Sequence, residues 1–266
     1  MTRYSLIFVL LGLLTLAFHE ISDGRGVFLA TTTSVRDTGL LKELLPNVKA
    51  IGVGSGQALQ MGLRKEADLL ITHYPKLELQ FMADGFGIQR RAFMYNRFVI
   101  VGPVTDPAGI AQLGTLAEAF KAISTSRERF ISRGDGSGTH AREIAIWGVA
   151  RASPFSTRYV STGTGMGSTL ATAESLKGYT LTDETTFTSL KPKLRLFRFD
   201  DEMTLNLYSA ILVSELARDT FHFITSPKVA PIIEGKGFFP CRDVAGIKAA
   251  PSEPTDSRMI CPRMRQ

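Results

Sequence analysis

Short apolar runs alternate with amphipathic segments along most of the chain. One amphipathic segment places Leu40, Leu41, Leu44 and Leu45 at the spacing of one helix face. By the same criteria, helices are predicted near 40–45, 57–64, 76–84, 116–123, 140–151, 169–175, 185–190 and 221–235. Strands are predicted near 26–30, 48–53, 67–72, 98–101, 129–132, 159–160, 179–182, 195–199 and 208–213. This alternation predicts an α/β fold with mainly parallel sheets flanked by helices.

Four segments rich in glycine, serine and threonine lie between a predicted strand and the next helix. They cover 31–34, 54–57, 133–139 and 162–168. The first turn of a helix has unpaired N–H groups and a partial positive charge, and hydroxyl side chains add donors. Four such segments that converge on one cleft could bind a multivalent anion without a metal, with Arg133 adding a full positive charge and a planar donor fork. Any one segment is equally consistent with ordinary helix capping, so their recurrence is what favours an anion site.

Enzyme motifs are incomplete at these segments. None contains the Gly-Lys-Ser/Thr of a P-loop, and Gly163-Thr-Gly-Met-Gly167 is only a weak approach to a dinucleotide fingerprint. Asp135 and His140 are the candidates for a catalytic pair, although residues at the start of a helix are more often capping groups. The four histidines are scattered and the chain has no H-E-x-x-H or C-x-x-C motif, so we expect no metal site.

The N-terminal residues have features of a secretory signal peptide. Arg3 precedes a 14-residue uncharged run from Ser5 to Phe18, which has the length of a signal-peptide core and is short for a membrane span. A small-residue cleavage motif is missing, which leaves an uncleaved anchor or a buried helix as alternatives. We expect residues 1–22 to be a signal peptide, and the protein to be periplasmic or extracellular, or membrane-tethered if the segment is not cleaved.

The two cysteines, Cys241 and Cys261, both lie in the C-terminal tail. In an oxidising compartment they could pair and close the tail, and two free thiols are the alternative. If the protein is exported, the sequence favours the disulfide.

Composition excludes several classes of protein. The 266 residues are 44% hydrophobic and 21% charged, which is too apolar for a disordered chain, and two cysteines cannot hold together a fold of this size. The net charge is +6, but even the most basic stretch, 85–133, has only seven basic against three acidic side chains, and its aromatic residues do not follow an RNA-binding pattern. A nucleic-acid partner is therefore not expected. The charge favours a mildly basic surface, and attraction of a small anion into a cleft is the more specific alternative.

Six sequence blocks occur in order between about residues 27 and 213. They are Ala30-Thr-Thr-Thr-Ser34 with Asp37-Thr-Gly-Leu-Leu41, Gly52-Val-Gly-Ser-Gly-Gln-Ala-Leu59, Ala83-Asp-Gly-Phe-Gly87 through Phe98-Val-Ile-Val-Gly-Pro103, Phe130-Ile-Ser-Arg-Gly-Asp-Gly-Ser-Gly-Thr-His140, Thr162 to Thr169, and Tyr179-Thr-Leu-Thr-Asp183. Together they resemble the tungstate-binding proteins of bacterial ABC uptake systems. One departure is Leu205-Asn-Leu-Tyr208, where that family usually has Phe-Asn-Pro-Tyr.

The resemblance implies a two-lobed fold of the periplasmic binding protein type II kind, which closes on a tetrahedral oxyanion. The two crossovers between the lobes are expected near 102–107 and 198–206. The predicted organisation is a signal peptide at 1–22, lobe I at 23–103 and 206–240, lobe II at 104–205, and an unassigned tail at 241–266. The predicted ligand residues are Thr32, Thr33, Ser34, Ser55 and Gly56 from lobe I, with Arg133, Ser137, Gly138, Thr139, Met166 and Gly167 from lobe II.

The function implied by the resemblance is that of an extracytoplasmic solute-binding protein. It would bind tungstate, with molybdate as the next choice, and deliver the anion to an ABC permease as a monomer and without a cofactor or resident metal. Two alternatives stay open. One is an α/β enzyme that acts on a phosphorylated or other anionic metabolite in the same cleft, and the other is a sensor that signals to a membrane partner.

Overall fold

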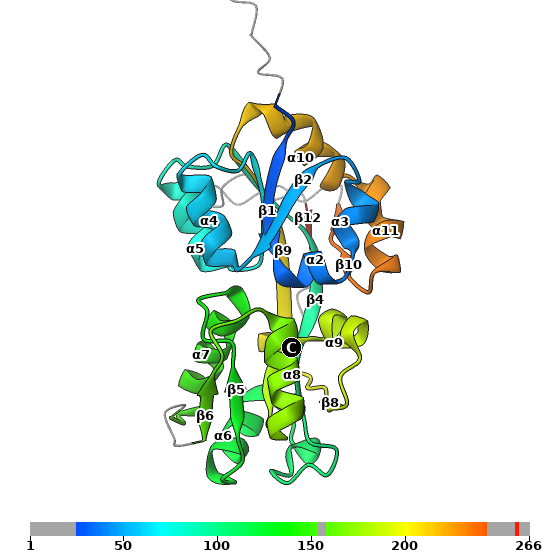
Figure 1. Ribbon diagram of the computed structural model, residues 1–266. Coiled ribbons are helices and arrows are strands. Elements are labelled where there is room, and N and C mark those ends of the chain that lie inside the picture. Colours follow the sequence, from blue (N-terminus) through cyan, green and yellow to red (C-terminus); the bar gives the residue numbers. More distant parts are fainter. Residues whose placement is uncertain (1–24, 154–157, 244–258, 261–266) are drawn as a thin grey trace, which may run out of the picture.

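The chain folds into two α/β lobes, which lie one above the other in Figure 1. The computed structural model describes residues 25–153, 158–243 and 259–260. The predicted signal peptide at 1–22 and the cysteine at position 261 lie outside the described residues.

The upper lobe, lobe I, is built mainly from the first part of the chain. Its elements in order are β1 Phe28–Thr32, α2 Thr33–Asp37, α3 Leu40–Leu44, β2 Lys49–Val53, α4 Ser55–Leu63, β3 Leu69–Thr72, α5 Pro75–Ala83 and the start of β4 Gln89–Gly102. Strand β1 lies between β2 and β3 and is parallel to both. The sheet continues from β3 to β9, β4 and β10, and these later pairings are antiparallel.

The lower lobe, lobe II, follows on from β4. Its elements are η1 Ile110–Gln112, α6 Leu116–Thr125, β5 Phe130–Ser132, α7 Gly138–Ala150, β6 Tyr159–Ser161, α8 Met166–Leu176, β7 Thr180–Asp183, α9 Glu184–Leu190, β8 Arg195–Phe197 and η2 Glu202–Thr204. The end of β4 pairs antiparallel with both β7 and β8, whereas β5 and β6 are parallel.

The chain then returns to lobe I. It forms β9 Leu205–Leu212, η3 Glu215–Ala217, α10 Arg218–Ile224, η4 Pro227–Val229, α11 Ala230–Gly235 and β10 Phe239–Pro240. Part of the tail that the sequence left unassigned forms a two-stranded antiparallel ribbon of β11 Arg242–Asp243 and β12 Met259–Ile260.

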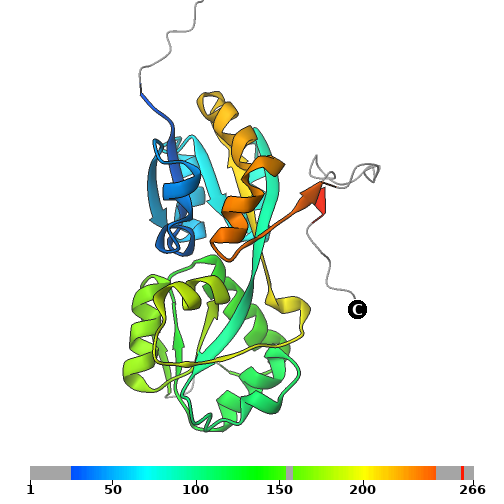
Figure 2. The same cartoon turned by 90° about the vertical axis from the view of Figure 1, so that its right-hand side faces the viewer.

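Strand β4 is shared by the two lobes, and Figure 2 shows it running from one into the other. Its residues up to Arg97 pair with β9, and Phe98 is the first to pair with β7. The first crossover therefore lies inside β4, ahead of the 102–107 segment expected from the sequence. The return to lobe I falls between β8 and β9, in the segment 198–206 where the second crossover was expected.

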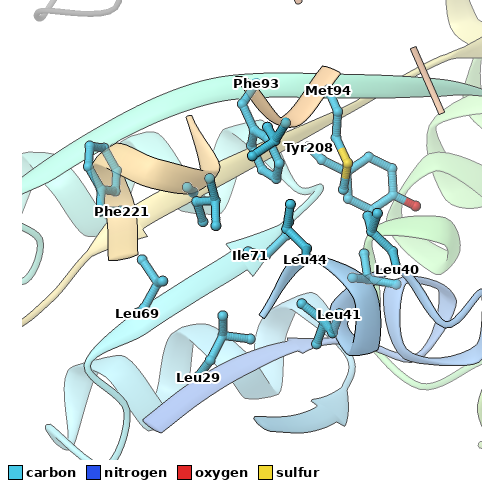
Figure 3. Close-up of a cluster of buried hydrophobic side chains, with 14 of the residues drawn as sticks. Leu29, Leu40, Leu41, Leu44, Leu69, Ile71, Phe93, Met94, Tyr208 and Phe221 are labelled. Atoms are coloured by element: carbon cyan, nitrogen blue, oxygen red, sulfur yellow. The ribbon is translucent and has the colours of Figure 1, made fainter. Parts of the chain in front are cut away.

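Each lobe has its own apolar core. In lobe I, side chains from β1, α3, β3, β4, β9 and α10 pack together, among them Leu29, Ile71, Phe93 and Phe221 (Figure 3). In lobe II, an aromatic cluster of Phe120, Phe130 and Trp147 holds α6 and α7 against β5. Because each core lies within one lobe, the interface between the lobes is left to polar segments.

The α/β class predicted from the sequence is confirmed, with two differences in detail. The sheets are mixed rather than mainly parallel, because the two crossover strands β4 and β9 run in opposite directions and pair with each other. The predicted helix at 221–235 is broken into α10, η4 and α11. Pro227 lacks an N–H group and holds Ser226 in an extended conformation, so the helix ends before it.

Candidate functional site

Four helices begin at the interface between the lobes. They are α2 and α4 of lobe I, and α7 and α8 of lobe II. A Cβ added at Gly54 would lie 3.4 Å from Cβ of Ser137, and one added at Gly165 would lie 3.3 Å from Cγ2 of Thr33. Since each pair joins one lobe to the other, the four predicted segments converge and the lobes are closed.

The residues predicted from the sequence lie mainly in the first turns of these helices rather than in loops. Helices α4, α7 and α8 begin two or three residues earlier than predicted, and α2 was not predicted at all. The reason is that serine, threonine and glycine are poor helix formers in an interior, although they are common in the first turn. Because these helices begin at the interface, the unpaired N–H groups of their first turns lie there.

The first cluster of hydroxyl groups follows β1. Thr32 is the last residue of the strand, and Thr33 and Ser34 open α2; all three are buried. The Ser34 hydroxyl lies 3.1 Å from Oγ1 of Thr32 and 3.0 Å from the Tyr208 hydroxyl. Oγ1 of Thr33 is buried without a hydrogen-bond partner. A buried, unpaired hydroxyl is costly, so this oxygen is suited to a ligand.

The second lobe I contribution comes from α4. Ser55 is fully buried, and its hydroxyl accepts the backbone N–H of His73 at 3.2 Å. Its hydroxyl hydrogen therefore remains available to an acceptor in the interface. A Cβ added at Gly56 would lie 3.1 Å from the carbonyl oxygen of Gly136, so a side chain here would push slightly against lobe II.

Arg133 follows β5 and is almost fully buried, with 2% of its surface exposed. It donates from Nε and Nη2 to Oδ2 of Asp135, at 3.1 and 2.5 Å. The other carboxylate oxygen of Asp135 accepts the N–H of Ser137. Gly134 and Gly136 both have positive φ, which lets the chain turn tightly around this carboxylate. Asp135 thus offsets the charge of Arg133 and fixes the loop that leads into α7.

The start of α7 brings three predicted residues into the interface. Ser137 is the N-cap and accepts the N–H of His140 at 3.3 Å, while Gly138 and Thr139 form the first turn. All three are buried. Gly138 lies against His73 of lobe I, where a Cβ would come within 2.5 Å of the His73 carbonyl oxygen.

Met166 and Gly167 form the first turn of α8, after the N-cap Gly165. The Met166 side chain is fully buried in an apolar cluster with Val99 and Leu170. It therefore contributes to the core of lobe II, and only the backbone N–H groups of this turn can serve an anion. The sequence could not distinguish these two roles.

Four residues that the sequence did not single out also lie at the interface. They are His73, Asn96, Asn206 and Tyr208, each with at most 4% of its surface exposed. His73 Nδ1 lies 2.8 Å from Oδ1 of Asn206, and the ring stacks on Tyr208 at a centroid distance of 4.8 Å. Burial lowers the pKa of His73 to about 3, so the ring is neutral at pH 7. The tetrapeptide containing Asn206 and Tyr208 was noticed only as a departure from a family pattern.

The candidate catalytic pair is engaged in structural hydrogen bonds. Asp135 binds Arg133 and the N–H of Ser137, and His140 Nδ1 accepts the N–H of Gly136 at 3.0 Å. Both side chains thus stabilise the loop before α7, as capping groups do.

The buried carboxyl group of Glu143 stabilises the same loop through Ser132. Glu143 of α7 accepts hydrogen bonds from the hydroxyls of Tyr159 and Ser132, at 2.6 and 2.7 Å, and from the Trp147 indole at 3.3 Å. The Ser132 hydroxyl in turn accepts the N–H of Gly134. Burial raises the pKa of Glu143 to about 7 despite these three donors.

Two other kinds of feature are absent from the described residues. No group of three or more His, Cys, Asp or Glu side chains there is arranged to hold a metal ion. Across the same part of the chain, no helix combines the length and the hydropathy needed to cross a bilayer.

The sequence is also similar to known proteins over most of its length. Residues 21–232 match the PBP superfamily domain. The chain is 44% identical over 180 residues to the tungstate-binding protein TupA of Peptoclostridium acidaminophilum, a match that covers 64% of this chain and 63% of that protein. It is 36% identical to the tungstate-binding protein TupA of Campylobacter jejuni, with 67% of this chain and 71% of that one covered.

A solved structure extends the agreement to the fold. The crystal structure of the tungstate ABC transporter from Geobacter sulfurreducens is matched with a TM-score of 0.73 and 40% identity, over 79% of this chain and 98% of that one. The two-lobed arrangement is therefore shared over nearly the whole of that protein.

Proposed function

Since the chain belongs to the PBP superfamily, we propose that it is an extracytoplasmic solute-binding protein that binds tungstate between its lobes. Its similarity to two proteins named for tungstate binding supports this ligand. The observation that carries the proposal is the convergence of four helix N-termini on one closed, buried interface that also contains Arg133 and the unpaired hydroxyl of Thr33.

The chemistry of the interface suits a tetrahedral oxyanion. Hydrogen-bond donors can replace the water shell of the anion without transferring a proton to it. These donors are the backbone N–H groups at the helix starts and the hydroxyls of Thr32, Thr33, Ser34 and Ser55. Because Asp135 offsets the charge of Arg133, we expect hydrogen bonding rather than net charge to dominate the affinity. The proposed site residues are those predicted from the sequence, with Met166 contributing through its backbone.

Molybdate is the second ligand expected, because it has the same shape and charge. Sulfate is smaller, so its oxygens would not reach donors from both lobes at once. Selectivity against sulfate would then depend on the spacing of the donors in the two lobes, which are linked by the hydrogen bond from Asn96 to Asp183.

The cellular role that we propose is delivery of the anion to an ABC permease by a monomeric protein outside the cytoplasm. The signal-like segment before residue 23 supports the location, and the similarity to a tungstate ABC transporter supports the partner. In this role the protein binds and releases its ligand by closing and opening the lobes, without catalysis.

Isothermal titration calorimetry tests the proposal. The purified protein is titrated with tungstate, molybdate, sulfate and phosphate in separate experiments. We expect saturable binding of one tungstate per chain and weaker or no binding of sulfate and phosphate. Absence of binding to all four oxyanions would overturn the proposal.

A further inference from the structure

Two buried asparagines face each other where the lobes join. Asn96 of β4 and Asn206 of β9 are register partners, and Asn96 lies two residues before Phe98, the first residue of β4 to pair with lobe II. Nδ2 of Asn206 donates to Oδ1 of Asn96 at 2.7 Å, and Nδ2 of Asn96 donates to Oδ1 of Asp183 at 2.7 Å. Asp183 ends β7, so this chain of hydrogen bonds connects the two lobes.

The orientation of the Asn96 amide is fixed by Thr185 and Asp183. The Thr185 hydroxyl donates its one hydrogen to the carbonyl oxygen of Gly237, so its oxygen must accept from Nδ2 of Asn96, 3.1 Å away. Oδ1 of Asp183, which also accepts the backbone N–H of Thr186, accepts from the same NH₂ group. The oxygen of Asn96 must then face Asn206, which fixes the orientation of the second amide as well.

Asn206 uses the second hydrogen of its NH₂ group in the opposite direction, toward the candidate anion site. Nδ2 of Asn206 also donates to the hydroxyl of Tyr208 at 3.1 Å. The Tyr208 oxygen accepts from Asn206, so its one hydrogen can be donated to the Ser34 hydroxyl, 3.0 Å away. When Tyr208 donates to Ser34, and Thr32 at 3.1 Å does likewise, Ser34 keeps its own hydrogen for another acceptor. Its near neighbour in the interface is Thr32, beside the unpaired hydroxyl of Thr33.

We propose that Asn96, Asn206 and Tyr208 form a hydrogen-bond relay that begins at Asp183, in which Tyr208 donates to Ser34 and so makes Ser34 a donor to the bound oxyanion. The inference rests on the proposed function, and it adds three positioning residues that need not touch the ligand. The relay also explains why Tyr208, whose ring packs in the lobe I core, carries a hydroxyl that reaches the interface.

A double-mutant cycle tests the relay, with tungstate Kd measured by calorimetry for the wild type, Tyr208→Phe, Ser34→Ala and the double variant. Removing one hydrogen bond of this kind should raise Kd about tenfold in Tyr208→Phe. In the Ser34→Ala background, Tyr208→Phe should alter Kd less than about twofold, because the Ser34 hydroxyl that Tyr208 orients is already missing. A merely structural role of Tyr208 would raise Kd equally in both backgrounds.

Tyr179→Phe is the matched control. The Tyr179 hydroxyl is also buried and hydrogen-bonded, to Asp106 and the N–H of Ala108, but it lies within lobe II and away from the relay. Its loss should leave Kd unchanged. Asn206→Asp gives a second test, since it replaces the donor to Tyr208 by an acceptor and should also weaken binding about tenfold or more.

The outcomes separate the relay from the proposed function. If the wild type binds no oxyanion, the proposed function fails. If the wild type binds tungstate but Tyr208→Phe binds equally well, or loses affinity equally with and without Ser34, the relay is overturned while the proposed function stands.

Discussion

Gly138 of lobe II lies so close to His73 of lobe I that a Cβ at this glycine would be 2.5 Å from the His73 carbonyl oxygen and 2.9 Å from two atoms of its ring. The backbone of His73 is held in turn by Ser55, to which its N–H donates. The contact between Gly138 and His73 exists only when the lobes are closed, because the two residues belong to different lobes. The space at Gly138 therefore decides whether closure is possible.

Gly138→Ala should hinder closure while it leaves each lobe folded. Overpacking of this kind costs about 1–3 kcal/mol, so the tungstate Kd should rise roughly 10- to 100-fold. Small-angle scattering should show that tungstate no longer compacts the protein. Gly148→Ala in the same helix is the control, since a Cβ there meets no atom within 4 Å. Tungstate binding by Gly138→Ala with wild-type affinity would contradict the prediction.

Arg133→Ala should weaken tungstate binding by about 100-fold or more, because it removes charge-assisted donors and leaves the Asp135 carboxylate unpaired beside the anion. Calorimetry on Arg133→Ala and on the double variant Arg133→Ala/Asp135→Asn separates these two effects. If Arg133 donates to the anion, the double variant stays weak. Recovery of wild-type affinity in the double variant would show that Arg133 serves only to neutralise Asp135. Arg129→Ala, at an exposed position of the same lobe, is the control.

Glu143 should make the protein less stable as pH rises through neutrality. Burial raises its folded-state pKa to about 7 from the ordinary value of 4.5, so the folded state holds a proton that the unfolded state releases. Its contribution to stability is complete below pH 4.5 and is lost as pH rises through about 7, with a magnitude on the order of 2–3 kcal/mol. Chemical denaturation at pH 5 and pH 8 should show this loss for the wild type and a smaller one for Glu143→Gln. Equal losses in the two proteins would rule out Glu143 as the cause.

The tail should be closed by a disulfide between Cys241 and Cys261. The register of β11 and β12 pairs Arg242 with Ile260, and each cysteine is the chain neighbour of one of these residues. Peptide mapping under non-reducing conditions should yield one linked peptide. Replacing both cysteines by serine should lower the free energy of unfolding by about 3 kcal/mol. Detection of two reactive thiols after oxidative refolding would contradict the pairing.

The sequence predicted those elements whose pattern is local. The spacing of Leu40, Leu41 and Leu44 is visible in the chain, and α3 follows it. Strand β4 was predicted only at its apolar end, because its residues before Phe98 include three arginines that look like surface residues. One of them, Arg90, is nevertheless mostly buried, since it forms an ion pair with the buried Glu78 of α5 at 2.8 Å. Such compensation depends on a distant partner and cannot be read from a local pattern.

At the candidate site, too, features within one segment could be predicted, whereas interactions between distant segments could not. The segments around Ser34, Ser55 and Arg133 were selected because each one carries its donors within a few residues, and the fold brings them together. The relay through Asn96 and Asn206 was missed, because it depends on the register of two strands that lie far apart in the sequence. An isolated asparagine within a strand does not indicate which side chain of the neighbouring strand will lie opposite it.

The shared strand β4 makes lobe II an insertion into the sequence of lobe I. Lobe II leaves lobe I after Arg97 and re-enters it at Leu205, and these two residues are paired neighbours in antiparallel strands (Figure 2). Lobe II is thus an insertion whose two ends meet side by side. A short hairpin turn between β4 and β9 would restore a continuous lobe I, and lobe II could be excised, exchanged or grafted as a single cassette.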